Sequence, residues 1–275
     1  MRRLLAICPD LALIDALSSG LADHDLVISG GNVEALHRLR DLAIDVVITD
    51  PTTSVTEDLA LASEVRAVRP GVKVIVLAPA TTHDDVVAAL RAQVFACFTA
   101  PFDFREVAAM GLSALEAVDW KHGIEVVSGL PYWMTLRVSC NLLTAERLVR
   151  FMTEREDSLP EKDRDLLMTA FREMLVNAME HGAGFDPGKV IDVTAARTER
   201  AIVYHFRDPG NGFDRADLAH AAKTRRPEEI IDITLEREKA GRRPGGFGML
   251  LVKQIADELV YNERGNEVLL IKHLK

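Results

Sequence analysis

The first 120 residues alternate between short apolar runs and longer segments in which apolar residues recur every three or four positions. The short runs predict buried strands, and the longer segments predict helices. The expected strands are Leu4–Cys8, Leu26–Ser29, Asp45–Thr49, Lys73–Ala78 and Phe95–Phe98. The expected helices cover residues 11–22, 32–43, 57–68, 83–92 and 103–118. Five such units predict an α/β fold with a doubly wound parallel sheet in the flavodoxin-like strand order.

The pattern changes after the stretch from Trp120 to Gly123, so we predict two domains, 1–120 and 121–275. Residues 123–129 and 132–140 alternate as a β-hairpin does. Further expected elements are a helix over Thr144–Glu156, a helix through Phe171–Gly182, a strand over Arg200–Arg207, a helix after Gly248 and one final strand. The last helix has an expected apolar stripe of Met249, Leu250, Val252, Ile255 and Ala256.

Composition narrows the class of protein. The hydrophobic content of 48% is enough for two cores, and no apolar run approaches the roughly 20 residues that span a bilayer. The start of the chain is too quickly interrupted by charge for a signal peptide. Cys8, Cys97 and Cys140 are scattered, so we expect core residues of a cytoplasmic protein and no zinc site or disulfide. The net charge of −9 argues against direct binding of nucleic acid.

Three polar residues stand at one helix face of the second domain. Glu173, Asn177 and His181 are spaced four apart, and Met174, Leu175, Ala178 and Met179 lie on the other side of the same helix. The amide oxygen of Asn177 suits Mg²⁺, and Glu173 is placed to accept a proton from an attacking hydroxyl or water. The alternative for this motif alone is an ordinary solvated helix face.

Two glycine-containing segments follow. Asp208, Gly210 and Gly212 come directly after the strand over Arg200–Arg207, and glycines there permit positive φ and close approach to a ligand. Gly245, Gly246 and Gly248 open the last helix, whose first N–H groups are able to bind phosphate. A single glycine-rich loop is often only a tight turn, but three motifs in this order favour a nucleotide site.

This constellation resembles the GHKL superfamily of ATP-binding domains, which includes gyrase, histidine kinases and anti-sigma factor kinases. The resemblance covers residues 124–275 and implies an α/β sandwich that binds ATP with Mg²⁺. Glu173, Asn177 and His181 match its N box. Asp208, Gly210 and Gly212 match a first glycine box, in which the Asp accepts from the adenine amino group. Gly245, Gly246 and Gly248 match a second glycine box, which holds the phosphates beneath a lid, here 214–244.

Within that superfamily the flanking segments are similar to the anti-sigma factor serine kinases. A histidine kinase carries its phosphoacceptor His on a two-helix hairpin, whereas here a β-hairpin precedes the N box, and we expect His122 simply to be exposed. The resemblance implies Glu173 as the base and an antagonist (STAS-type) protein as substrate, with a sigma factor as a further partner. Arg243, just before the phosphate-binding glycines, is a candidate clamp for the γ-phosphate. The alternative function is a non-catalytic, ATP-loaded module that sequesters a partner.

The first domain resembles a response-regulator receiver, with Asp50 at the end of the third strand as the matching phosphoacceptor. The metal-binding acidic pair is replaced by Cys8 and Pro9, the switch hydroxyl by Ala78 and the lysine by Ala100. Because phosphoryl transfer to a carboxylate needs charge neutralisation, we favour a loop-capping role for Asp50 over phosphorylation. The domain is then a docking or homodimerisation module, expected to use the face built from its fourth and fifth units.

Overall fold

The structure, a computed structural model, describes residues 2–7, 10–21, 24–117, 121–130, 132–212 and 247–274. The chain divides into two compact units, one comprising residues 1–125 with Arg150–Glu156, and the other comprising residues 126–149 and 157–275. Among the described residues, no helix has both the length and the apolar character needed to cross a membrane.

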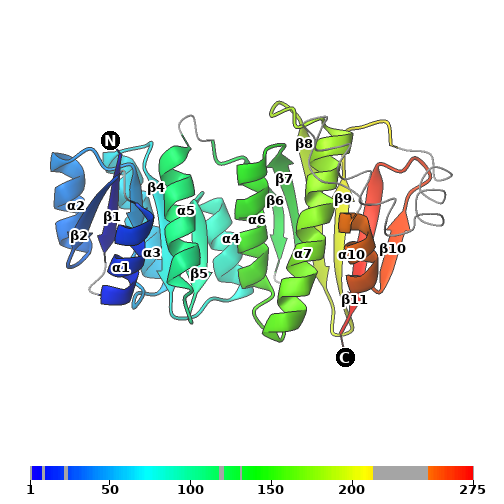
Figure 1. Cartoon of the computed structure of the whole chain (residues 1–275), viewed down its shortest axis with the longest axis horizontal. Helices are drawn as coiled ribbons and strands as arrows, with labels where there is room; N and C mark the ends of the chain where they lie inside the picture. The colour runs from blue at the N-terminus through cyan, green and yellow to red at the C-terminus, as the bar shows by residue number, and fades with distance from the viewer. Residues whose placement is uncertain are drawn as a thin grey trace. The chain divides into compact units, whose positions relative to one another are not determined.

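The first unit is a five-stranded sheet in the order β2-β1-β3-β4-β5, and the registered pairs along it are parallel (Figure 1). Its strands are β1 (Arg3–Ile7), β2 (Asp25–Ser29), β3 (Val46–Ile48), β4 (Lys73–Ala78) and β5 (Ala96–Thr99). Its helices are α1 (Leu11–Gly20), α2 (Asn32–Asp41), α3 (Val55–Val68), α4 (His83–Arg91) and α5 (Phe104–Glu116). The flavodoxin-like order predicted from the sequence is confirmed.

Burial explains why the strands of this unit are continuous apolar runs. Every residue of β4 is buried, as expected for a parallel strand covered by helices on both faces. Contacts link α1 with α5, and α3 with both α2 and α4, so the helices form two groups. Local signals fix the helix starts, since Ser54 with Glu57 and Thr82 with Asp85 form reciprocal capping boxes.

The second unit is a six-stranded sheet in the order β10-β11-β9-β8-β7-β6 with helices on one face (Figure 1). Its strands are β6 (Ile124–Leu130), β7 (Trp133–Ser139), β8 (Val190–Arg197), β9 (Ala201–Arg207), β10 (Glu258–Tyr261) and β11 (Glu267–His273). Its helical segments are α6 (Leu142–Arg155), α7 (Glu161–Asn177), the π-helical turn η1 (Ala178–Gly182) and α10 (Phe247–Ile255). The last residues of α6 are grouped with the first unit.

The strands of this sheet alternate between buried and more exposed residues, as expected when one face is covered. In β9, Ile202, Tyr204 and Phe206 are buried. Phe171 of α7 packs on two of them, with ring centroids 4.8 Å from Tyr204 and 5.1 Å from Phe206. This aromatic contact fixes the N-box helix against the centre of the sheet.

Three details of residues 121–275, the second domain predicted from the sequence, differ from the sequence-based prediction. Two strands follow α10, not one, because the turn between Asn262 and Asn266 folds the end of the chain into the β10–β11 hairpin. Leu250, expected in the apolar stripe of α10, is exposed, whereas Val252 and Ile255 are buried. His122, expected to be exposed, is 9% exposed and therefore buried.

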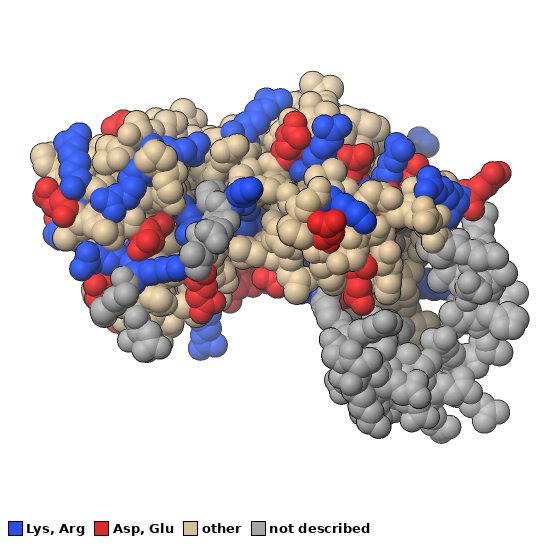
Figure 2. Space-filling model, turned by 90° about the horizontal axis from the view of Figure 1, so that it is seen from above, with Lys and Arg blue, Asp and Glu red and all other residues tan. Residues whose placement is uncertain are grey.

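Charged side chains of both signs are interspersed over the surface seen in Figure 2. Cys97 and Cys140 are buried, in agreement with the core role expected for them, and Cys8 lies outside the described residues.

Candidate functional site

The N box lies where α7 changes from an α-helix to a π-helix. The α-helix ends at Asn177, and η1 runs from Ala178 to Gly182, so the regular spacing that predicted the alignment of His181 is interrupted. Single π turns occur frequently at functional sites. Met174 and Met179 are buried as expected, while Glu173 retains 27% exposure of its side chain. The N box therefore presents polar groups away from the sheet-facing side of its helix.

The first glycine box packs against the end of this π turn. Asp208 Oδ1 accepts from Gly210 N at 2.8 Å. A Cβ added to Gly182 would overlap the Asp208 side chain, and one added to Gly210 would crowd both Asp208 and Gly182. Gly182 is thus a functional residue that sequence reasoning did not single out, although it ends the motif. Its missing side chain allows Asp208 to approach the N box.

The surroundings of Asp208 alter its acidity. Burial raises the pKa of this carboxyl, and the Gly210 N–H together with the nearby Arg264 and His181 side chains opposes the rise. Such a partly buried, hydrogen-bonded carboxylate favours a ligand that donates hydrogen bonds, as the amino group of adenine does.

The β10–β11 turn holds the first glycine box from the other side. Asp208 N donates to Asn266 O at 3.0 Å, and Asn266 Nδ2 donates to Asp208 O at 3.1 Å. Arg264 Nη2 donates to Asn211 Oδ1 at 3.3 Å. Gly212 has a φ of +78°, and an added Cβ would overlap Arg264 O. Sequence reasoning missed Arg264 and Asn266, which lie far along the chain from this box.

The start of α10 reaches the N box. A Cβ added to Gly248 would overlap the Glu173 carboxylate, and Asn177 Nδ2 donates to Met249 Sδ at 3.4 Å. The structure therefore brings together all of the predicted site residues that it describes in this unit, namely Glu173, Asn177, His181, Asp208, Gly210, Gly212 and Gly248. Arg243, Gly245, Gly246 and the predicted lid lie outside the described residues.

These residues fit a nucleotide held with a magnesium ion. With its amide nitrogen turned toward Met249, Asn177 offers Oδ1 as a hard oxygen ligand. Among the described residues, no group of three or more His, Cys, Asp and Glu side chains is placed to hold a metal. One protein oxygen suits an ion that keeps waters and phosphate oxygens as its remaining ligands. The glycines at 182, 210 and 248 leave the close approaches free of side chains.

In the first unit, Asp50 lies just after β3, and one oxygen of its carboxylate is engaged in hydrogen bonds. Asp50 Oδ1 accepts from both Thr52 N, at 2.8 Å, and Thr52 Oγ1, at 2.6 Å. Asp10, the nearest acidic residue after β1, caps α1 by accepting from Ala12 N and Leu13 N. This arrangement fits the loop-capping role, and whether Asp50 is ever phosphorylated stays a prediction. Cys8 and Pro9 lie outside the described residues.

Beneath Asp50 lies a buried carboxylate that sequence reasoning did not identify. Asp58 is fully buried, and its two oxygens accept from Thr49 Oγ1 at 2.9 Å and Thr53 Oγ1 at 2.6 Å. Burial raises the pKa of Asp58 to about 6 despite these hydrogen bonds. The spacing of Asp58 from the helix cap Ser54 predicts only that Asp58 lies in a helix. No sequence pattern predicts that its carboxylate is buried.

Residues 140–272 match the family model of the histidine kinase-like ATPase domain. The resemblance to a GHKL-type ATP-binding domain is confirmed by this match, which implies that the domain binds ATP. No curated protein matches the chain.

Solved structures of receiver domains are also similar to part of the chain. A CheY-like receiver domain protein from Methanospirillum hungatei is 20% identical, with 42% of this chain and 94% of that chain covered and a TM-score of 0.37. A response regulator from Thermotoga maritima is 19% identical, with 42% and 99% covered and a TM-score of 0.37. Because these identities and TM-scores are low, the fold of the first unit is established by its own strand order and not by these matches.

Proposed function

We propose that the protein is an ATP-dependent serine/threonine protein kinase of the anti-sigma factor type, which phosphorylates a small antagonist (STAS-type) protein. The observation that carries the proposal is the position of Glu173. Its carboxylate lies against Gly248 at the start of α10, one helical turn from Asn177, and its side chain is 27% exposed. Its Oε1 lies 3.8 Å from Arg172 Nη1, and in this proposal the partly exposed carboxylate receives a hydroxyl group brought by a protein substrate.

Each residue has one task in this proposal. Asp208 accepts from the adenine amino group and sets the orientation of the nucleotide. Asn177 Oδ1 ligates the magnesium ion, which neutralises charge on the phosphates when it is bound. The substrate serine oxygen attacks the γ-phosphorus, the bond to the β-phosphate oxygen breaks and ADP leaves. Glu173 accepts the proton of the serine hydroxyl as the oxygen attacks, so the phosphoserine ester forms without a proton on its bridging oxygen.

The test is phosphotransfer from labelled ATP with Mg²⁺ to the antagonist proteins encoded in the same genome. Glu173→Gln keeps the shape of the side chain and removes its basicity. We expect nearly unchanged ATP affinity and phosphotransfer reduced by at least about a hundredfold, the lower range for loss of a general base. Glu161→Gln, at an exposed position of the same helix, is the matched control and should retain the wild-type rate.

Asn177→Ala separates metal binding from base catalysis. Removing the metal ligand should weaken binding of the magnesium–nucleotide complex and slow phosphotransfer together. Wild-type rates in Glu173→Gln would show that Glu173 is not the base. If neither wild type nor variants phosphorylate any antagonist while all bind ATP and a partner protein, the kinase proposal is wrong and the alternative, a partner-sequestering module, replaces it.

A further inference from the structure

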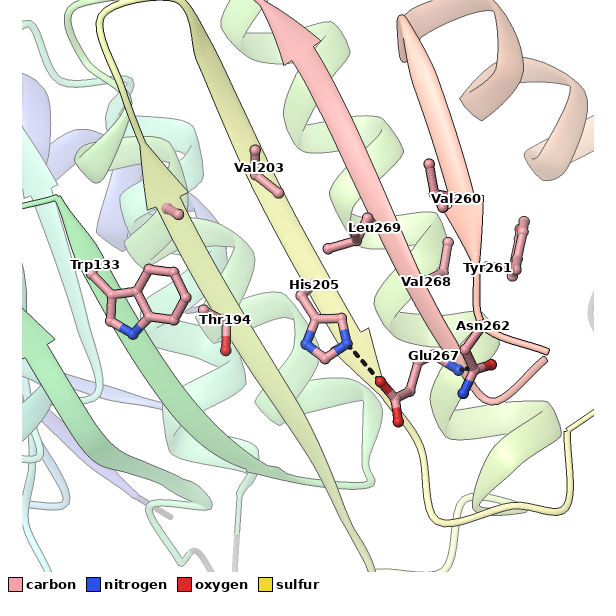
Figure 3. A pocket seen from close by; sticks show the side chains of 11 residues that line it. Trp133, Thr194, Val203, His205, Val260, Tyr261, Asn262, Glu267, Val268 and Leu269 are labelled. Atoms are coloured by element: carbon pink, nitrogen blue, oxygen red, sulfur yellow. Dashed lines mark hydrogen bonds and ion pairs between the residues drawn. The ribbon is translucent and has the colours of Figure 1, made fainter. Parts of the chain in front are cut away.

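The face of the six-stranded sheet that points away from α7 carries a hollow of about 490 Å³ (Figure 3). In the view of Figure 3 the helices lie behind the strands, and the side chains of Trp133, Val203, His205 and Leu269 stand in front. Strand alternation accounts for this, because Tyr204 and its buried neighbours in β9 face Phe171 on the other side. We call this surface the open face.

Strand register arranges the open face in three rows that run across β7, β8, β9 and β11. The apolar row is Trp133, Ala196, Val203 and Ile271. The middle row is Thr135, Thr194, His205 and Leu269. The charged row is Arg137, Asp192, Arg207 and Glu267. Within these four strands, apolar and charged residues are thus separated along the strand direction, while Glu258 of β10 lies in register with Ile271.

The charged row alternates in sign from strand to strand. Arg137 Nε lies 3.5 Å from Asp192 Oδ1, and Arg207 Nε lies 3.5 Å from Glu267 Oε1. The row therefore has no net formal charge, although the chain carries −9. A surface without net charge is a place where two copies of an acidic protein approach without strong repulsion.

An alternating row of four charges is complementary to its own reversed order. A two-fold axis parallel to the strands, between β8 and β9, sets each row of one copy over the same row of the other in reversed order. Arg137 then faces Glu267 of the second copy, and Asp192 faces Arg207 of the second copy. In the apolar row, Trp133 faces Ile271 and Ala196 faces Val203. An axis perpendicular to the strands would instead set the apolar row against the charged row.

We propose that the open face is the interface of a homodimer, in which two copies stack their sheets about this two-fold axis. Isologous interfaces of this kind are the commonest in soluble oligomers, and stacked sheets keep their strands within about 30° of each other. Trp133, 49% exposed in one copy, supplies the bulky apolar group that such an interface buries. The site formed by Asn177 and Asp208 lies on the helical side of the sheet, so the interface leaves it accessible. The inference does not depend on the kinase proposal.

Two charge reversals test the pairing that the axis requires. Arg137→Glu places Glu against Glu267 of the second copy, and Glu267→Arg places Arg against Arg137 of the second copy. Each variant alone should lose self-association by at least about a hundredfold, because like charges then face each other twice. In an equal mixture, both facing pairs of the mixed dimer are of opposite sign, so the mixture should form heterodimers.

Sedimentation velocity of the full chain at micromolar concentration measures the state of each sample. The wild type should be dimeric, each variant monomeric, and the mixture dimeric with one copy of each variant. Lys162→Glu, an exposed charge reversal on α7, is the matched control and should stay dimeric. Thermal unfolding and nucleotide binding report whether each variant is folded.

Three outcomes would overturn the proposal. A monomeric wild type would show that the open face is free or is covered within one chain. Dimers that persist in both variants would place the interface elsewhere. Folded, monomeric variants that do not associate when mixed would show that Arg137 and Glu267 do not face each other across the axis.

Discussion

The position of Asp208 is fixed by three neighbouring residues. Two of them are glycines that leave room for its side chain, and the third forms hydrogen bonds with its backbone. Gly182 and Gly210 make room for its carboxylate, and Asn266 exchanges two hydrogen bonds with its backbone. A partly buried acceptor with one N–H already directed at it has little freedom to rotate. The geometry of this single residue thus depends on segments about 80 residues apart in the chain, from 182 to 266.

Replacing Asp208 by Asn should weaken ATP binding about ten- to a hundredfold, since a buried polar group left without its partner costs about 1–3 kcal/mol. The amide keeps the size of the side chain but presents a donor where adenine also donates. Titration calorimetry of the full chain measures the affinity. Asp165→Asn, at an exposed position of α7, should bind as the wild type does. Equal affinity in Asp208→Asn would contradict the assignment.

Asp58 gives the first unit a defined dependence on pH. Its pKa is raised from 3.8 to about 6 by burial, so the folded state holds a proton that the unfolded state has already lost between these values. Stability therefore falls as the pH rises from about 4 to about 6, and stays lower above that range.

Asp58→Asn should remove this loss and stabilise the first unit at pH 8 by about 2 to 3 kcal/mol, with little gain near pH 4. The amide keeps its contacts, because the Thr53 hydroxyl lies 2.7 Å from Asp50 O and is able to donate there while accepting from Asn. Denaturant unfolding at both pH values measures the difference. Asp41→Asn, exposed on α2, is the control, and a variant less stable than wild type at pH 8 would refute the prediction.

At the scale of elements, the contact between η1 and the loop after β9 joins two of the motifs. Gly182→Ala should abolish nucleotide binding and lower the melting temperature. The new Cβ would overlap the carboxyl group of Asp208 and also the Asp208 Cβ. A shift of the backbone, not only of a flexible side chain, is required. Gly188→Ala meets only Asp186 Oδ1, at 3.2 Å, and should be tolerated. Nucleotide binding by folded Gly182→Ala would show that the two motifs need not touch.

Most elements were predictable because their signals are local. In the first unit each expected strand and helix is present within a few residues, since a buried parallel strand reads as an apolar run and capping boxes mark helix starts. The N-box helix was equally accessible from its spacing. Its change to a π-helix at Ala178 was not, because no residue pattern signals the shift in hydrogen bonding.

The helix that follows the second glycine box, α10, and the end of the chain were harder to predict. Glu258–Tyr261 is too short to stand out as a strand, and it exists through pairing with β11. Asn262 Oδ1 accepts from the backbone N–H groups of Gly265, Asn266 and Glu267, which makes the hairpin turn, yet its contact with the loop after β9 is non-local. Site residues supplied by such contacts, Arg264 and Asn266 among them, do not follow from spacing.

At the scale of the whole molecule, one chain combines an ATPase-type domain with a receiver-like fold in which several receiver residues are replaced. Ala78 and Ala100 stand at the positions of the switch hydroxyl and lysine, and Asp50 Oδ1 accepts two hydrogen bonds from Thr52. The buried carboxylate nearby, Asp58, is held by two threonine hydroxyls. The residues that would hold a metal next to Asp50 are thus engaged in structure or replaced.

Beryllofluoride with Mg²⁺ should therefore leave the protein unchanged. A phosphoryl group or its mimic adds charge that needs a metal and a cation for neutralisation, and the described residues hold no group of three acidic, His or Cys side chains suited to a metal. We expect amide spectra of the full chain, its ATP affinity and its phosphotransfer rate to be the same with and without the reagent. Asp50→Asn should behave as the wild type in each measurement. Spectral changes that appear in the wild type and disappear in Asp50→Asn would establish that the first unit is a working receiver.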